Sequence, residues 1–266
     1  MIRVGIGGWT FEEWRGSFFP KGLSHAKELE YASRKLTTIE INGTFYRTQT
    51  PASFRKWFDE TPDDFVFSVK APRYIVGKKE LGSSGDMIGV FMNSGLAELG
   101  AKLGPIFWQL APFKQFDAED IGAFFKLLPK ETGGRPLRHA VEVANKSFAD
   151  HAFIDLARAA GIAIVCLDKE GAVPISDVTA DFTYARLQRT VEEEPAGYPP
   201  ADLDQWLARA KAWEKGIAPK DLPAVGSGAK SPKAKRDVFV YFISGAKVRA
   251  PAAAMALIER LDGKRA

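Results

Sequence analysis

The sequence predicts a single-domain α/β protein, a (β/α)8 TIM barrel with eight parallel strands, and two observations support this prediction. Short runs rich in β-branched and aromatic residues recur along the whole 266-residue chain, each followed by a segment with helical spacing. Several runs, such as residues 162–167, are apolar at every position, which is typical of parallel strands buried on both faces. Eight such units in about 250 residues match a (β/α)8 barrel. An open doubly wound sheet is the alternative, and the strand count argues against it.

The expected elements alternate along residues 1–266. The expected strands are residues 2–7, 37–41, 65–70, 105–110, 140–143, 162–167, 182–187 and 238–243. The expected helices are residues 24–35, 52–60, 88–102, 118–128, 147–160, 201–215 and 251–261. Asp117 can cap the helix that follows it, and Pro51 and Pro251 suit a first helical turn. The connection over residues 168–180 contains Pro174 and is expected to lack a helix.

Composition excludes several protein classes. With 45% apolar and 12% aromatic residues, the chain is neither disordered nor collagen-like. No apolar run approaches the roughly 20 residues that a membrane-spanning helix needs, so no membrane partner is expected. The first residues lack the pattern of a secretory signal, and the single cysteine, Cys166, forbids an intramolecular disulfide. We therefore expect a cytoplasmic protein, while the oligomeric state stays open.

Positive charge is concentrated in one segment. The formal net charge is +4, but residues 215–236 hold six basic side chains and one acidic side chain, and elsewhere the two signs nearly balance. Because this segment is also rich in proline and glycine, we predict a flexible basic loop at about residues 216–236. Such runs are usually solvated, so nucleic acid is not the expected partner.

In a (β/α)8 barrel the reacting groups lie at the carboxyl ends of the strands. Polar residues at the predicted strand ends are Glu40, Asn42, Lys70, Gln109, Glu142, Asp168 and Arg186. Aromatic residues that could wall a pocket there are Trp9, Trp14, Phe45, Tyr46, Tyr74, Trp108, Tyr184, Tyr241 and Phe242.

Glu40 and Glu142 each lie between apolar residues of a predicted strand, where a carboxylate needs a cation or hydrogen-bond donors. A structural ion pair with Lys70 or Arg186 would meet that need. Alternatively, the two carboxylates serve as general acid and base or hold a hard divalent cation, although nothing else in the sequence supports a metal. Lys70 could bind an anion, form a Schiff base if desolvated, or pair with a carboxylate.

Other chemistries lack support in the sequence. His25, His139 and His151 are too scattered for zinc-ligand spacing, and no nucleotide-binding glycine motif or serine-nucleophile elbow occurs, so no cofactor is identified. Cys166 lies within an apolar strand and is expected to be an inert core thiol.

These residues also resemble a known family, the DUF72 or YecE-like proteins, along nearly the whole chain. The matching motifs are Gly7-Gly8-Trp9-Thr10, Trp14-Arg15-Gly16, Phe18-Phe19-Pro20, Glu40-Ile41-Asn42-Gly43-Thr44-Phe45-Tyr46, Trp57 with Thr61-Pro62, Phe65 to Ala71, Leu103-Gly104-Pro105, Trp108-Gln109-Leu110, Val141-Glu142, Tyr184-Ala185-Arg186, Val240-Tyr241-Phe242 and Ala250-Pro251. The resemblance implies a (β/α)8 barrel of unestablished biochemical function. The pocket residues that it implies are Glu40, Asn42, Tyr46, Lys70, Gln109, Glu142 and Arg186.

The chain departs from that family's pattern at several places. Ala144 and Asn145 stand where many members have arginine and histidine, Gln188-Arg189 replaces histidine-glycine, and Ser244 replaces asparagine. The loss of an imidazole removes the side chain best suited to proton transfer near neutral pH.

Three function hypotheses follow. The first is a barrel protein that binds and converts a small polar or anionic metabolite, sugar-like or phosphate-like. Glu40, Glu142 and Lys70 would be its catalytic residues, and Trp9, Asn42, Tyr46, Gln109 and Arg186 would bind substrate. The second is a non-catalytic ligand-binding relative that lacks the usual Arg-His pair. The third, a metal-dependent nucleic-acid enzyme, rests on fold analogy alone.

Overall fold

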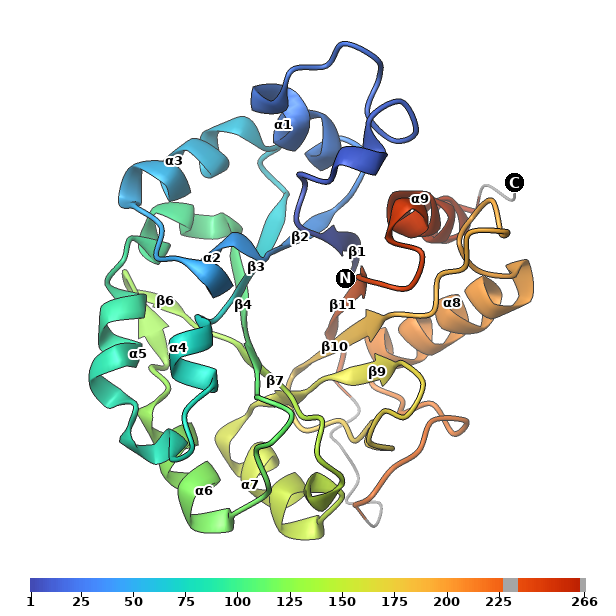
Figure 1. Cartoon of the computed structure of the whole chain (residues 1–266). Coiled ribbons are helices and arrows are strands. Elements are labelled where there is room, and N and C mark those ends of the chain that lie inside the picture. Colours follow the sequence, from blue (N-terminus) through green and yellow to red (C-terminus); the bar gives the residue numbers. More distant parts are fainter. Residues whose placement is uncertain (227–233, 264–266) are drawn as a thin grey trace.

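The computed structural model describes residues 1–226 and 234–263, which form a parallel barrel surrounded by helices (Figure 1). The main sheet has nine strands in the order β8-β7-β4-β3-β2-β1-β11-β10-β9, all paired in parallel. They are β1 (Ile2–Gly7), β2 (Thr38–Ile41), β3 (Val66–Lys70), β4 (Leu103–Gln109), β7 (His139–Glu142), β8 (Ala163–Ile164), β9 (Cys166–Asp168), β10 (Phe182–Leu187) and β11 (Asp237–Phe242).

The ninth strand arises because the predicted sixth strand is divided in two. β8 pairs with β7 and β9 pairs with β10, and Val165 joins them. The Val165 N–H still donates to the Val141 carbonyl oxygen at 2.9 Å. One continuous run of residues therefore connects both ends of the sheet, and the predicted (β/α)8 architecture is confirmed.

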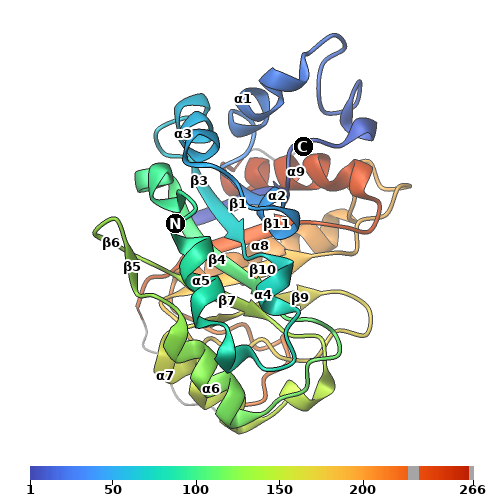
Figure 2. The same cartoon turned by 60° about the vertical axis from the view of Figure 1, so that its left-hand side comes forward.

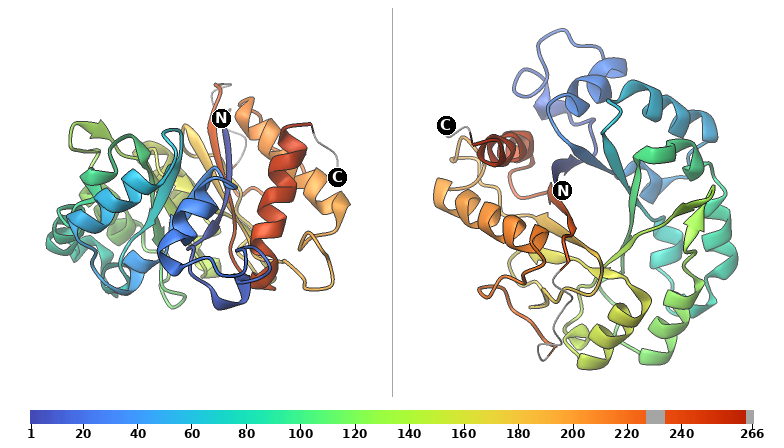
Figure 3. Two further views of the ribbon diagram at one scale, coloured as in Figure 1. Left: turned by 90° about the horizontal axis from the view of Figure 1, so that it is seen from above. Right: turned by 180° about the vertical axis from the view of Figure 1, so that it is seen from behind.

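The outer helices surround the barrel in the views of Figures 2 and 3, and each overlaps a predicted helix. They are α1 (Glu28–Ser33), α3 (Pro51–Glu60), α5 (Gly85–Met92), α6 (Ala118–Leu127), α7 (His151–Ala160), α8 (Pro200–Glu214) and α9 (Ala250–Leu261). Asp117 caps α6 by accepting from the Asp120 N–H, as predicted. Between β9 and β10 the chain forms no helix, also as predicted.

Three predicted helices are shorter than expected. The predicted helix 88–102 divides into α5 and a 3-10 segment, Leu96–Lys102, because Gly95 has a left-handed φ of 116°. The predicted helices 24–35 and 147–160 begin with the 3-10 turns His25–Lys27 and Lys146–Phe148. Asp150 then caps α7 through the Ala152 N–H.

Two four-residue helices and one hairpin were not predicted. α2 (Gly43–Tyr46) follows β2 directly and α4 (Arg73–Val76) follows β3, and both are too short to show helical periodicity. β5 (Glu131–Thr132) and β6 (Arg135–Pro136) form an antiparallel hairpin. Gly133 and Gly134, at the turn of this hairpin, both have positive φ.

The barrel interior is filled by large rings. Phe107, Tyr184, Phe239 and Tyr241 are buried inside it. The Tyr184 hydroxyl lies 2.9 Å from Ser68 Oγ and the Tyr241 hydroxyl 2.8 Å from Thr38 Oγ1. A second apolar layer lies between the strands and the helices, and it includes Trp14, Trp108 and Phe242. These rings, together with Tyr184 and Tyr241, belong to the core and do not wall a pocket.

Part of the predicted basic loop, residues 227–233, lies outside the described residues. The described flanks, residues 217–226 and 234–236, contain no helix or strand. Across residues 1–226 and 234–263, no helix is both long and apolar enough to span a lipid bilayer.

Gly5 tests the close approach of β1 and β2. A Cβ on Gly5 would lie 1.8 Å from the Thr38 carbonyl oxygen, so Gly5→Ala forces the strands apart. We expect the free energy of unfolding to fall by at least about 2 kcal/mol in urea titrations. The control is Gly89→Ala within α5, where no atom lies within 4 Å of the added carbon. It should stabilise by about 0.5–1 kcal/mol, and equal effects of the two substitutions would contradict this account.

Candidate functional site

Arg186 of β10 is bound to two carboxylates that come from strands on other sides of the barrel. Its Nε and Nη2 lie 3.1 Å from Glu40 Oε2 and Oε1 on β2, and its Nη1 lies 2.5 Å from Glu142 Oε2 on β7. The guanidinium carbon lies 4.6 Å from the centre of the Phe107 ring. Glu40 is fully buried and Arg186 is 3% exposed. The structure thus brings together three of the predicted site residues in one charge cluster.

Further hydrogen bonds fix both carboxylates. The Tyr184 hydroxyl donates to Glu40 Oε2 at 2.7 Å, and Gln109 Nε2 donates to Glu142 Oε1 at 2.6 Å. Burial opposes the charge on Arg186, but the carboxylates of Glu142 and Glu40 outweigh it and raise the pKa of the guanidinium. Burial, and then the negative charge of Glu40, raise the pKa of Tyr184 well above its usual value. Arg186 and Tyr184 therefore stay protonated at any working pH.

Lys70, at the end of β3, lies beside this cluster without joining it. Its side chain is buried, and its Nζ lies 4.3 Å from the centre of the Phe45 ring and 5.7 Å from that of Phe107. Among the described residues this amine has no hydrogen bond and no ion pair. The expected pairing of Lys70 with a carboxylate is absent because Arg186 occupies both carboxylates. Burial lowers the pKa of Lys70, and the charge of Glu40 only partly offsets that effect.

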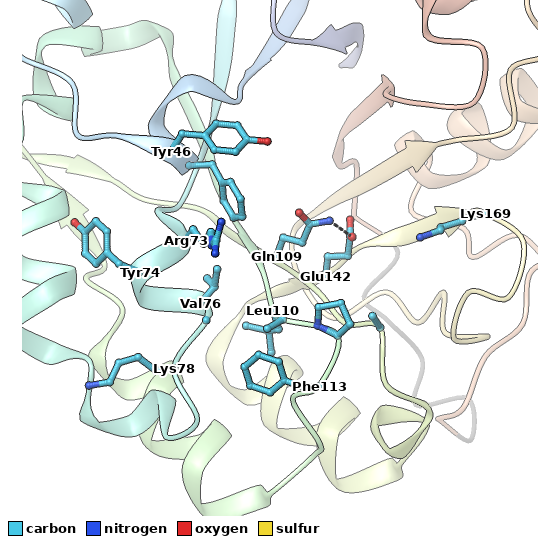
Figure 4. Close-up of a pocket in the computed structure, with 15 residues that line it drawn as sticks. Tyr46, Arg73, Tyr74, Val76, Lys78, Gln109, Leu110, Phe113, Glu142 and Lys169 are labelled. Atoms are coloured by element: carbon cyan, nitrogen blue, oxygen red, sulfur yellow. Dashed lines mark hydrogen bonds between the residues drawn. The ribbon is translucent and has the colours of Figure 1, made fainter.

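A cavity of about 730 Å³ opens at the carboxyl ends of β3, β4 and β7. Gln109 and Glu142, joined by their hydrogen bond, lie at its centre in Figure 4, with Tyr46, Tyr74 and Phe113 around them. The cavity is large enough for a small metabolite.

The predicted binding residues divide between the cavity and other surroundings. Tyr46 and Gln109 line the cavity, as does Phe45. Trp9 packs edge-on against Trp57 at 5.2 Å and does not line the cavity. Asn42 also lies outside the lining, with its amide nitrogen against Gly7, where a Cβ would come within 2.8 Å of it.

Three cationic residues of the cavity were not among the predicted site residues. Arg73 and Lys78 come from the segment that follows β3, and Lys169 follows β9 directly. All three lie in segments that directly follow the carboxyl ends of strands, Arg73 in the short helix α4 and the other two in loops, which is the position that a (β/α)8 barrel uses for its site. The sequence signal that could have identified these three residues is their position shortly after a predicted strand. They lie one to eight residues beyond the polar strand-end residues Lys70 and Asp168.

The remaining predicted polar positions have structural partners. Asp168 accepts from the Tyr198 hydroxyl at 2.8 Å. Asn145 accepts from the Ser147 N–H, and Ser244 Oγ donates to Gln188 Oε1 at 3.1 Å. Burial raises the pKa of the Cys166 thiol to about 11, which agrees with an inert core cysteine.

The fold and the position of the cavity place the chain in the class of (β/α)8 barrels with a polar pocket at the carboxyl ends of the strands. Within that class the chain belongs to the DUF72 family, described as "Protein of unknown function DUF72", whose model matches residues 3–266. UPF0759 protein YunF of Bacillus subtilis is 28% identical over 160 residues, which cover 58% of this chain and 55% of that protein. UPF0759 protein YecE of Escherichia coli K12 is 27% identical over 149 residues, which cover 56% and 50%.

The chain thus spans about half the length of these two relatives. Solved structures agree in fold. A DUF72 family protein from Thermotoga maritima has a TM-score of 0.75 at 20% identity and covers 98% of this chain and 99% of its own. One from Enterococcus faecalis has a TM-score of 0.66 at 16% identity, with 99% and 98% covered.

Glu40→Gln tests the charge cluster. The substitution removes one of the two negative charges that are paired with buried Arg186. We therefore expect the free energy of unfolding to fall by about 3–5 kcal/mol in denaturant titrations. Glu259→Gln, at an exposed position of α9, should change it by less than about 0.5 kcal/mol. A loss below about 1 kcal/mol for Glu40→Gln would show that the cluster is not a tightly coupled unit.

Lys70→Met tests the buried amine of Lys70, which has no hydrogen-bond acceptor or ion pair among the described residues. Because the folded state disfavours the charged amine, the substitution should stabilise the protein by about 1 kcal/mol at pH 7. A lowered folded pKa means that the penalty is full at low pH and is relieved as the pH rises toward the unfolded value of 10.5, so the gain should shrink at pH 10.

Lys102→Met is the matched control for Lys70→Met. The Lys102 amine donates to the carbonyl oxygens of Phe58 and Thr61, both at 2.6 Å. Its removal should therefore destabilise by about 1–3 kcal/mol. Destabilisation by Lys70→Met as large as that by Lys102→Met would show that Lys70 has a structural role.

Proposed function

We propose that the cavity at the barrel mouth binds a small anionic metabolite of the sugar-phosphate or sugar-acid type. The observation that carries the proposal is the balance of charge around the cavity. Arg73, Lys78 and Lys169 line it, whereas its one carboxylate, Glu142, is already paired with Arg186. Neither Arg73 nor Lys169 has an ion pair with a described residue. An anionic group would supply the missing partner.

The aromatic residues of the cavity support a ligand with a carbon skeleton. Tyr46 is 77% exposed and Phe113 is 63% exposed, although both are large hydrophobic residues. Together with Phe45 and Tyr74 they present ring faces and edges to the cavity. Rings of this kind pack against the C–H faces of a sugar, while Gln109 can bond a hydroxyl.

We propose Glu142 as the general acid or base of this cavity. Glu142 faces the cavity, whereas Glu40 is fully buried behind Arg186 and does not line it. Two carboxylates that act on a glycosidic bond must both face the substrate across an open cleft. The pair Glu40 and Glu142 does not have that arrangement, so Glu40 is proposed as the residue that positions Arg186.

A non-catalytic binding protein is the second candidate. Both carboxylate oxygens of Glu142 already accept hydrogen bonds, from Arg186 and Gln109, which limits their freedom to take a proton. Asn145, at the position of the family's usual histidine, caps a turn. Ligand binding without turnover would favour this candidate.

A thermal-shift titration with sugar phosphates, sugar acids and the matching neutral sugars tests the proposal. Anionic compounds should raise the melting temperature, and the neutral sugars should not. Arg73→Gln should weaken binding about tenfold, since it removes a charge-assisted hydrogen bond.

Arg135→Gln in the β5–β6 hairpin is the control variant and should bind like the unaltered protein. This hairpin precedes β7 and lies at the amino end of that strand (Figure 2), whereas the cavity is lined by residues at and after the carboxyl ends of the strands. Equal shifts for neutral and anionic sugars, or equal losses in the two variants, would contradict the proposal.

A further inference from the structure

Three lysines are buried in the part of the chain that the structure describes, and they differ in what holds their amines. Lys102 donates to two backbone carbonyl oxygens, of Phe58 and Thr61. Lys114 is paired with Asp120 and also donates to the Lys79 carbonyl oxygen. Lys70 has neither kind of partner. A buried amine normally has a hydrogen-bond acceptor or a paired carboxylate, whereas the Lys70 amine has only the rings of Phe45 and Phe107 beside it among the described residues.

We propose that Lys70 is a nucleophilic amine that forms a Schiff base with a small anionic aldehyde or ketone held in the cavity. The inference rests on the proposed anion-binding function and names the reactive group of its ligand. Lys70 adjoins the cavity through Phe45, which lines it and whose ring centre lies 4.3 Å from Nζ. The register of β3 and β4 pairs Lys70 with Phe107, two residues before the cavity residue Gln109.

The local structure holds Lys70 in this position. The Thr44 hydroxyl of α2 donates to the Lys70 carbonyl oxygen at 2.6 Å, so α2 is tied over the end of β3. The ring of the next residue, Phe45, has its centre 4.3 Å from the amine.

The chemistry balances without a further reagent. The neutral amine nitrogen attacks the carbonyl carbon, the C=O π pair moves to oxygen, and a proton passes from nitrogen to oxygen to give a carbinolamine. Loss of the hydroxyl with one proton as water then leaves a C=N bond to Nζ. Glu142 lines the cavity and its charge acts on Lys70, so the proposal assigns these proton transfers to Glu142, which gives up its hydrogen bond from Gln109 to take a proton.

Burial of the Lys70 amine favours its neutral form. Glu40 from β2 and Glu142 from β7 stabilise the charged form, while Arg186 from β10 and burial oppose it. The net direction is a lowered pKa for Lys70, which makes the amine available at lower pH than an exposed lysine. Arg186 also restrains the two carboxylates that would otherwise pair with the amine.

Reductive trapping tests the inference. The whole protein is incubated with glyceraldehyde 3-phosphate and sodium cyanoborohydride, which delivers hydride to the C=N carbon and makes the adduct permanent. Peptide mass spectrometry then locates it. We expect Lys70 to be labelled at least about fivefold faster than exposed Lys126 of α6 near pH 7, with the excess falling as the pH approaches 10.

Internal and external controls separate this inference from the proposed function. Lys102 and Lys114 should stay unlabelled, and neutral glyceraldehyde should label Lys70 more slowly than its phosphate. Lys70→Arg should lose the adduct but still bind glycerol 3-phosphate, which has no carbonyl group. Binding of glycerol 3-phosphate without preferential labelling at Lys70 would overturn the Schiff base and leave the anion site standing. Failure of both anions to bind would overturn the proposed function itself.

Discussion

The organisation of the mouth depends on one interaction, the contact of Arg186 with Glu40 and Glu142. A single planar guanidinium meets one carboxylate through two parallel bonds and a second through its remaining nitrogen. It thereby ties β10 to β2 and to β7. Glu142 is 44 residues from Arg186 in the sequence, and Glu40 is 146 residues from it. Buried charge clusters add little net stability, but a cluster left incomplete is costly, so the arrangement specifies this geometry strongly. The aromatic rings beneath it supply the apolar support.

That contact also determines the state of Lys70. Two carboxylates and one guanidinium leave one negative charge, which a protonated Lys70 would balance. The amine is nevertheless buried against Phe45 and Phe107 and has no direct acceptor among the described residues. Burial therefore favours the neutral amine of Lys70, whereas the negative charges of Glu40 and Glu142 favour the protonated amine.

Most of the fold could be predicted because strand and helix patterns are local. β1 and β10 begin and end as predicted, and the sixth strand was located but its division at Val165 was not. The candidate site could be predicted only in part. Glu40, Glu142 and Arg186 were recognisable because a charge inside an apolar strand needs a partner. Which cation would satisfy the carboxylates, Lys70 or Arg186, depends on side-chain reach across the barrel, and no sequence pattern encodes that. Arg73, Lys78 and Lys169 lie in the segments after strands, outside any periodic pattern, so only their position after a strand end could indicate a place at the site.

The departures from the family's usual pattern have different consequences for binding and for proton transfer. Ala144 lines the cavity at a place where the pattern has arginine, yet Lys169, from the loop after the neighbouring strand β9, lines the same cavity. The positive charge is therefore supplied from another loop, and the change at Ala144 does not by itself argue against anion binding. The histidine position is different, because the side chain of Asn145 is engaged by the Ser147 N–H and carries no titratable group. Glu142 lines the cavity and is bound to Arg186, whereas Lys70 lies beside Phe45 next to the cavity, so the proposed proton transfer falls to Glu142 and Lys70 is the proposed nucleophile.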